Sequence, residues 1–82
     1  MWYVYIIKCN DGKLYTGTTS NLGRRYLEHK YGKGGKFTRG RKVIKLLYSE
    51  KYLNSKEAFG RERQIKGWRR EKKENLIKFG KP

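Results

Sequence analysis

The pattern of hydrophobic positions near the N-terminus predicts a β-hairpin. Residues 2–7 form an unbroken run of aromatic and aliphatic side chains, which is typical of a strand covered on both faces. The turn sequence Asn10-Asp11-Gly12 follows, and Asp-Gly between two such runs favours a tight reversal of the chain. Residues 14–19 then predict the second strand. Gly17 weakens that strand, so we expect a close approach by backbone or ligand at this position.

A first helix and a third strand are predicted after the hairpin. Asn21 is a suitable N-cap for a helix that runs to about Tyr31 and ends at Gly32. Residues 32–42 are rich in glycine and in cations, and they predict a flexible basic loop. The apolar run that follows predicts the third strand over residues 43–49.

Two further helices are predicted toward the C-terminus. Residues 54–57 (Asn-Ser-Lys-Glu) resemble a capping box, and the helix that they open is expected to break near Gly67. A last short helix passes through residues 76 and 77 and ends at Gly80. The order strand-strand-helix-strand-helix-helix predicts an α+β fold, in which helices flank a three-stranded, mostly antiparallel sheet. With 82 residues, the chain 1–82 is expected to form one domain.

Composition bounds the core and indicates the partner. Apolar residues make up 35% of the chain and aromatic residues 15%, so we expect a small core built around Tyr, Trp and Phe. Lys and Arg number 22 against 7 Asp and Glu, and the net charge of +15 favours a polyanionic partner, nucleic acid above all. The sequence shows neither a membrane span nor a basic amphipathic helix, and it has one cysteine, Cys9. We therefore expect a cytoplasmic protein without a membrane partner.

Glu62 is the most informative acidic residue. It recurs at helical spacing with Ala58, Ile65 and Trp68, so it lies within or beside an apolar stripe. A carboxylate there loses hydration and needs a partner such as an arginine, a metal ion or a hydrogen-bond network. A structural ion pair is the plain alternative. Because seven acids cannot easily form a carboxylate cluster, phosphodiester cleavage by this chain would use a single metal ion or none.

A set of spaced motifs resembles the GIY-YIG nuclease superfamily, and most closely its short, stand-alone YhbQ-like group. In chain order the motifs are Val4-Tyr5, Tyr15-Thr16-Gly17, Asn21-Leu22-x-x-Arg25, His29 and Glu62. Each motif alone is weak, and tyrosine in a strand is also ordinary β packing. Their joint spacing is specific, and the resemblance covers residues 2–77, nearly the whole chain.

The resemblance implies a set of catalytic residues. Tyr5 takes the tyrosine of the first motif, which reads Tyr-Val-Tyr here rather than Gly-Ile-Tyr, and Tyr15 takes that of the second. Glu62 would hold one Mg²⁺ or Mn²⁺ ion, and Arg25 would neutralise charge that develops on the phosphate. Tyr5 or Tyr15 would act as the general base. His29, one helical turn after Arg25, would either assist proton transfer or be a solvated helix residue.

Basic residues outside the motifs are expected to contact the nucleic acid backbone, although each of them alone can equally be a solvated surface residue. The loop offers Phe37 for stacking on a base, and Lys13 would touch the phosphate beside the second motif. The predicted nucleic-acid-binding residues are Lys13, Lys36, Phe37, Arg39, Arg41, Lys42, Arg61, Lys66 and Arg69, with Arg70 beside the last of them.

The sequence thus predicts a metal-dependent nuclease that hydrolyses nucleic acid phosphodiester bonds. The resemblance alone favours DNA over RNA, with structure-specific or single-strand-specific cutting in repair or recombination. A protein partner would supply specificity, because 82 residues leave no room for a separate recognition domain. Two alternatives stay open. One is a non-catalytic basic DNA- or RNA-binding protein on the same scaffold, which makes no use of Glu62, and the other is an interaction module for an acidic protein.

Overall fold

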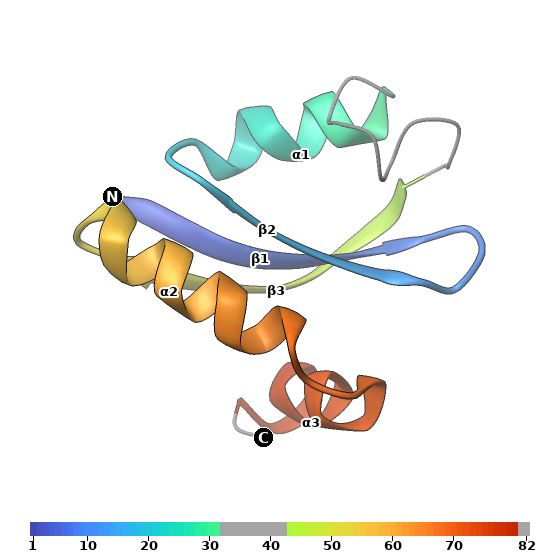
Figure 1. The fold of residues 1–82 in the computed structure, drawn as a ribbon. Coiled ribbons are helices and arrows are strands. Elements are labelled where there is room, and N and C mark those ends of the chain that lie inside the picture. The colour runs from blue at the N-terminus through green and yellow to red at the C-terminus, as the bar shows by residue number, and fades with distance from the viewer. Residues whose placement is uncertain (32–42, 81–82) are drawn as a thin grey trace.

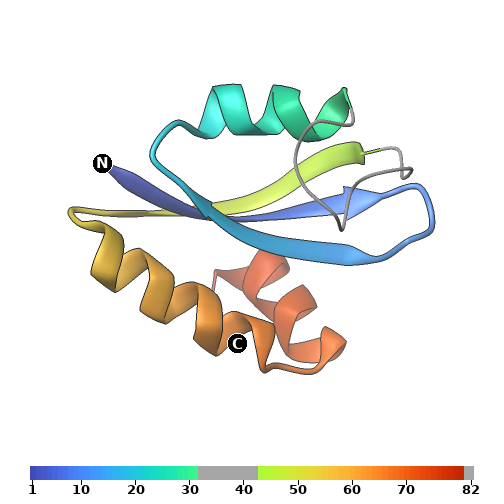
Figure 2. The same cartoon turned by 45° about the horizontal axis from the view of Figure 1, so that its top comes forward.

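The structure, a computed structural model, describes residues 1–31 and 43–80, the side chains of residues 43 and 44 excepted. The elements are β1 (Trp2–Cys9), β2 (Leu14–Thr19), α1 (Leu22–Lys30), β3 (Val43–Tyr52), α2 (Ser55–Lys66) and α3 (Arg70–Phe79). Helix α1 covers one face of the sheet, and α2 and α3 cover the other (Figure 1, Figure 2). The predicted α+β architecture is confirmed. Within the described ranges, none of the helices is both long enough and apolar enough to span a membrane.

The sheet has the strand order β2-β1-β3, and both pairings are antiparallel. Strand β2 has the predicted bounds. Strand β3 continues to Tyr52, three residues beyond the predicted end, because β1 begins at Trp2 and pairs with Tyr52 there. The sheet register places Tyr5 opposite Gly17 on the neighbouring edge strand. This pair positions much of the site described below.

The helix starts follow the predicted capping chemistry. The side chain of Asn21 accepts a hydrogen bond from the backbone N–H of Arg24 at 3.0 Å, and Asn54 accepts one from Glu57 at 2.9 Å. Each bond satisfies a backbone donor that the first helical turn leaves unpaired. The predicted break after α2 is confirmed, since that helix is capped at Gly67. The predicted stop of α1 at Gly32 lies outside the described residues.

The core divides between the two faces of the sheet. On the α2 and α3 side, Val4 and Ile6 pack with residues of the two helices; the buried members are Val4, Ile6, Ala58, Ile65 and Leu76. On the α1 side the buried members are Tyr5, Ile7 and Cys9. The expectation of a core built around aromatic side chains is wrong in this respect. Tyr5 is buried, but Trp2 and Trp68 only flank the aliphatic cluster, and Phe59 is half exposed.

One carboxylate outside the core is fully engaged by the fold. Glu50 accepts two hydrogen bonds from Arg61, at 2.9 and 3.0 Å, and one from each of Tyr48 and Tyr52 at 2.6 Å. Burial alone would raise the pKa of Glu50, but the hydrogen bonds from Arg61 and the two tyrosines outweigh it and lower that pKa. The Arg61 guanidinium also lies over the ring of Trp68. Arg61, predicted to contact nucleic acid, is therefore held in a structural network that ties α2 to β3.

Replacing Arg61 by alanine is expected to destabilise the fold by about 2 kcal/mol, because Glu50 would lose its charge partner while still largely shielded from water. Urea unfolding of Arg61→Ala measures this loss. Arg69→Ala removes the same charge from an exposed position and is expected to change the free energy of unfolding by less than about 0.5 kcal/mol. Equal stability of the two variants would contradict a structural role for Arg61.

Candidate active site

The site begins with a close approach between two strands. Tyr5 on β1 lies opposite Gly17 on β2, with its aromatic ring over the glycine. A Cβ atom at position 17 would lie 2.5 Å from Cζ of Tyr5 and closer still to the hydroxyl oxygen. The predicted close approach at Gly17 is thus present, but it is made by a tyrosine side chain rather than by backbone or a ligand. The glycine of the second motif makes room for the tyrosine of the first.

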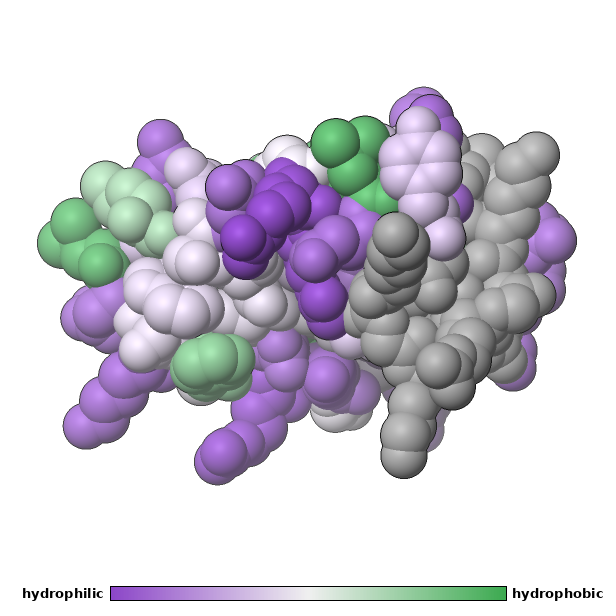
Figure 3. Space-filling view, turned by 90° about the horizontal axis from the view of Figure 1, so that it is seen from above, coloured by the Kyte–Doolittle hydropathy of each residue, from purple (hydrophilic) through white to green (hydrophobic). Residues whose placement is uncertain are grey.

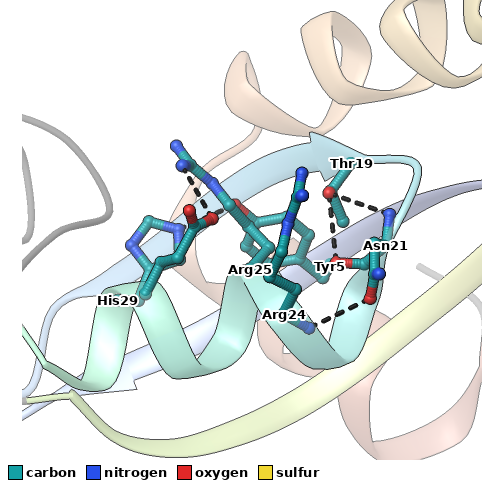
Figure 4. Close-up of polar contacts among 7 residues, drawn as sticks. Tyr5, Thr19, Asn21, Arg24, Arg25 and His29 are labelled. Atoms are coloured by element: carbon teal, nitrogen blue, oxygen red, sulfur yellow. Dashed lines mark hydrogen bonds and ion pairs between the residues drawn. The ribbon is translucent and has the colours of Figure 1, made fainter.

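The Tyr5 hydroxyl is held by two residues of α1. Its oxygen lies 2.8 Å from Nε2 of His29 in a buried hydrogen bond, and it also shares a hydrogen bond with Arg25. Figure 4 shows Arg25 and His29 on α1 beside Tyr5. Because a guanidinium can only donate, the phenol oxygen of Tyr5 accepts the hydrogen bond from Arg25. When the neutral imidazole of His29 carries its hydrogen on Nδ1, the Tyr5 hydroxyl donates to Nε2.

Burial sets the protonation states of this group. Burial raises the pKa of Tyr5 to about 12, although the hydrogen bond from Arg25 acts in the opposite direction. Burial and then the positive charge of Arg25 lower the pKa of His29 to about 4. The side chain of His29 is 0% exposed, so the alternative of a solvated helix residue is wrong. At neutral pH both groups are uncharged, and Arg25 carries the positive charge.

Tyr15 completes the group on the α1 face. Its ring meets the imidazole of His29 edge-on, with centroids 5.1 Å apart, and lies 6.4 Å from the ring of Tyr5. The predicted approach of the two tyrosines across the hairpin is therefore present. Tyr15 is only partly buried, whereas Tyr5 is 2% exposed. Of the two phenols, Tyr15 has the greater access to solvent and to a substrate.

Glu62 lies beside the same edge strand but reaches it from α2. Its Oε1 atom accepts a hydrogen bond of 2.5 Å from the hydroxyl of Thr18, and its Oε2 atom lies 3.0 Å from Nζ of Lys66. Thr18 pairs with Val4, which faces α2, so Glu62 and Tyr5 approach β2 from opposite sides of the sheet. Burial is the largest cause of the raised pKa of Tyr5, and the charge of Glu62 adds a small contribution across the sheet.

Lys66 connects the two halves of the site. Its ammonium group contacts Glu62 and lies 6.0 Å from the centre of the Tyr15 ring. Predicted to bind nucleic acid, Lys66 is thus placed between the carboxylate and the phenol. Lys13 and Arg69 are exposed, and the other predicted contacts, Lys36, Phe37, Arg39, Arg41 and Lys42, lie outside the described residues. On the α1 side, the described surface mixes hydrophilic, intermediate and hydrophobic residues, and hydrophilic side chains gather near its centre (Figure 3).

The fit of a metal ion rests on the environment of Glu62. Its side chain is 19% exposed, and the cation now on its Oε2 atom is the ammonium of Lys66, which is itself half exposed. A position that already favours a positive charge and reaches solvent suits a hard ion that keeps most of its water ligands. Among the described residues, no group of three or more His, Cys, Asp or Glu could enclose a metal ion. Glu62 can therefore provide one ligand, as Mg²⁺ or Mn²⁺ sites built with substrate oxygens require.

Thr18 is the contact that sequence reasoning missed. It holds one oxygen of Glu62 from the strand that also carries Tyr15 and Gly17. Alternation along β2 places it on the α2 face with Thr16, and this period was a usable signal. A threonine on a strand is too common, however, to be singled out as a functional contact without knowing that α2 packs against that face.

Fold and geometry together define a class of protein. Two tyrosines on a hairpin, an arginine and a histidine one turn apart on the following helix, and a glutamate on α2 meet at the edge strand of a β-β-α-β-α-α domain. This is the arrangement of a nuclease domain of GIY-YIG type. The family model described as the GIY-YIG catalytic domain matches residues 1–75.

Relatives support the same assignment over nearly the whole chain. A UPF0213 protein of Clostridium perfringens is 51% identical over 77 residues, covering 94% of this chain and 83% of the relative. A UPF0213 protein of Staphylococcus epidermidis is 44% identical over 78 residues, covering 95% of each. The solution NMR structure of a UPF0213 protein from Bacillus halodurans is 42% identical, with a TM-score of 0.60, and the match covers 94% of this chain and 83% of that one. This chain belongs to the GIY-YIG catalytic domain family.

The lowered pKa of His29 predicts acid sensitivity of the fold. Between pH 6.5 and 4 the imidazole takes up a proton in the unfolded chain but not in the folded one, so stability falls as pH falls through this window. The loss from this group reaches up to about 3 kcal/mol by pH 4 and is absent above pH 7. Urea unfolding at several pH values measures this loss of unfolding free energy. The loss between pH 7 and pH 4 should be smaller in His29→Gln.

The same prediction has a direct readout in the intact protein. The chain contains a single histidine, so its ring resonances in an NMR titration belong to His29 without further assignment. We expect no titration down to about pH 5. A midpoint near 6.5 would show that the imidazole is not held neutral by burial.

Proposed function

We propose that this protein is a nuclease that hydrolyses nucleic acid phosphodiester bonds with the help of one divalent metal ion. The observation that carries the proposal is the position of Glu62 beside β2, the strand that also carries Tyr15 and faces Tyr5. Its carboxylate is bound by Thr18 and Lys66 and is not locked in an ion pair with an arginine. Membership of a nuclease family supports it. The net charge of +15 supports a polyanionic substrate.

Arg25 binds the scissile phosphate. Burial alone would lower its pKa, but the hydrogen bonds with Tyr5 and Glu28 outweigh that effect and raise it, so the group stays charged. Its ion pair with Glu28 is long, at 3.5 Å, and both side chains are about one-third exposed. The guanidinium can therefore exchange this weak partner for phosphate oxygens, which match its planar array of donors. It stabilises the negative charge that develops as the phosphate is attacked.

Tyr15 is the general base, and Tyr5 is a positioning residue. The phenol oxygen of Tyr5 is buried and already holds Arg25 and His29, which leaves it poorly placed to meet a water molecule. Tyr15 is more accessible. Once its hydroxyl proton has passed to solvent, its oxygen takes one proton from the attacking water. The water oxygen bonds to phosphorus, the bond to the leaving oxygen breaks, and solvent returns a proton to that oxygen.

Glu62 is the residue that would hold a metal ion, Mg²⁺ or Mn²⁺, with its carboxylate. When bound, such an ion supplies Lewis-acid stabilisation of charge on the phosphate and the leaving group. Thr18 keeps the carboxylate turned toward β2, and the ion would take the place of the Lys66 ammonium on Oε2. DNA is the substrate that family resemblance favours, and cutting specific to single strands or branched structures is the form expected of a domain this small.

Cleavage assays test this proposal with labelled single-stranded, duplex and branched DNA and with RNA, each with and without Mg²⁺. Glu62→Gln is expected to lower kcat/KM at least 100-fold, because the amide cannot replace a carboxylate as an ion ligand. Glu71→Gln, on the exposed face of α3, is the matched control and should retain wild-type activity. Binding without cleavage of any substrate by the wild-type protein would favour the non-catalytic alternative.

The two tyrosines are separated by their phenylalanine variants. Tyr15→Phe is expected to abolish the metal-dependent reaction, lowering kcat by roughly 100-fold or more. Tyr5→Phe should lower kcat less, by about 10-fold, because its hydroxyl orients Arg25 and His29 but does not meet the attacking water. A larger loss in Tyr5→Phe than in Tyr15→Phe would reverse these roles.

A further inference from the structure

A second basic surface lies away from the catalytic group, between the β1–β2 turn and α3. Two adjoining hollows follow it, with volumes of about 240 and 250 Å³. Both are lined by Leu14 and Arg70, so they form one continuous groove, referred to here as the α3 groove. Figure 2 shows α3 beneath the sheet on this side. Its charged lining residues are Lys8, Lys13, Arg70, Lys73, Glu74 and Lys78.

The groove is strongly positive. Among the described residues it carries five cations against one acid, and that acid, Glu74, is paired with Arg70 at 3.3 Å on the surface. Arg70 also serves the fold through a hydrogen bond to Gly12, so the positive charge that favours an anionic ligand lies in the four lysines. The cations Arg70 and Lys73 lie in the first turn of α3, where the helix dipole disfavours positive charge, and this helix has no side-chain cap. The arrangement costs stability in the isolated domain and is offset when an anion occupies the groove.

The groove is also held in shape. The guanidinium of Arg70 donates a hydrogen bond of 2.7 Å to the carbonyl oxygen of Gly12, which ties the start of α3 to the hairpin turn. Gly12 itself has a left-handed φ of 83°, a conformation that fixes the turn and favours glycine. The start of α3 and the hairpin turn, which form the two walls of the groove, are therefore attached to each other.

The floor of the groove indicates what kind of ligand fits. It is formed by the aliphatic side chains of Leu14, Leu47 and Ile77, with the cations along the rim. Among the described residues that line the two hollows there is no aromatic ring, asparagine or glutamine, the groups that stack on bases or read their edges. Aliphatic contact below and cations at the sides suit sugar and phosphate, so recognition here would not depend on base sequence.

The groove leads to the catalytic group. Lys13 at its near end is two residues from Tyr15, about 7 Å along an extended strand. Lys66, at the end of α2, contacts Glu62 and has its ammonium group 6.0 Å from the centre of the Tyr15 ring. We infer that the α3 groove binds the backbone of the nucleic acid strand beyond the point of cleavage, wrapping around the edge of β2. This inference rests on the proposed function for the identity of the ligand.

The test measures binding in a Glu62→Gln background, in which the oligonucleotide is not cut. The groove variant combines Lys13→Gln with Lys73→Gln, and the control combines Lys51→Gln with Lys56→Gln, two exposed lysines on β3 and α2. Both pairs remove two positive charges. Fluorescence anisotropy with a labelled 20-nucleotide single strand and its duplex, from 50 to 200 mM salt, gives the affinity and its salt dependence. Circular dichroism confirms that every variant is folded.

The groove variant is expected to bind roughly 10- to 25-fold more weakly at 0.1 M salt. The slope of log K, where K is the binding constant, against the logarithm of the salt concentration should be less steep by about 1.5, as expected for the loss of two phosphate contacts. The control pair should change neither the affinity nor this slope appreciably.

Equal affinities and slopes for the two pairs would contradict nucleic acid binding in the α3 groove and would leave the nuclease proposal unaffected. Binding through the groove by a wild-type protein that cuts nothing would overturn the nuclease proposal alone. Polyglutamate is tested as a competitor. If it displaces the oligonucleotide from the groove at lower concentration than an unlabelled oligonucleotide does, the ligand of the groove is an acidic protein and the inference is wrong.

Discussion

The placement of a tyrosine ring over a glycine on the neighbouring strand is the constraint on which the site depends. Without a side chain at Gly17, the ring of Tyr5 lies between the sheet and α1, and its hydroxyl reaches Arg25 and His29. A larger residue at position 17 would displace the ring and with it the hydrogen bonds that orient the helix. The missing Cβ of Gly17 thus leaves room for the ring whose hydroxyl contacts Arg25 on the next element, α1. The spacing between the two tyrosine motifs has its physical origin here.

Glu50 and Glu62 differ in role because their carboxylates have different hydrogen-bond and charge partners. Glu50 is held by four hydrogen bonds from Arg61 and two tyrosines, and nothing remains with which it could bind a ligand. Glu62 has a hydroxyl and a half-exposed ammonium as its partners. The ammonium is mobile and strongly hydrated, so another cation can replace it at small cost. The difference lies in the partners, since both carboxylates are partly buried.

The fold was predictable because its determinants are local. The Asp-Gly turn, the caps at Asn21 and Asn54 and the break at Gly67 each act within a few residues, and each is present in the structure. The aromatic residues were less predictable. Composition shows how many rings there are, but burial depends on which strand face meets which helix, and Phe59 and Phe79 fall outside that contact. Arg61 likewise became structural through Glu50, eleven residues away on another element, which no local pattern reveals.

The excess of positive charge and the scarcity of acidic residues are related, because both make the protein depend on an anionic ligand. A domain of 82 residues with seven acids has little room for a closed metal cage, and its described residues contain none. On the proposed function, the substrate brings the missing oxygen ligands, since phosphate and water complete the sphere of a hard ion that one glutamate begins. The cations that attract the nucleic acid therefore also assemble the metal site, because they deliver its remaining ligands. Metal binding and substrate binding become mutually dependent, and neither site needs to be complete before the other is filled.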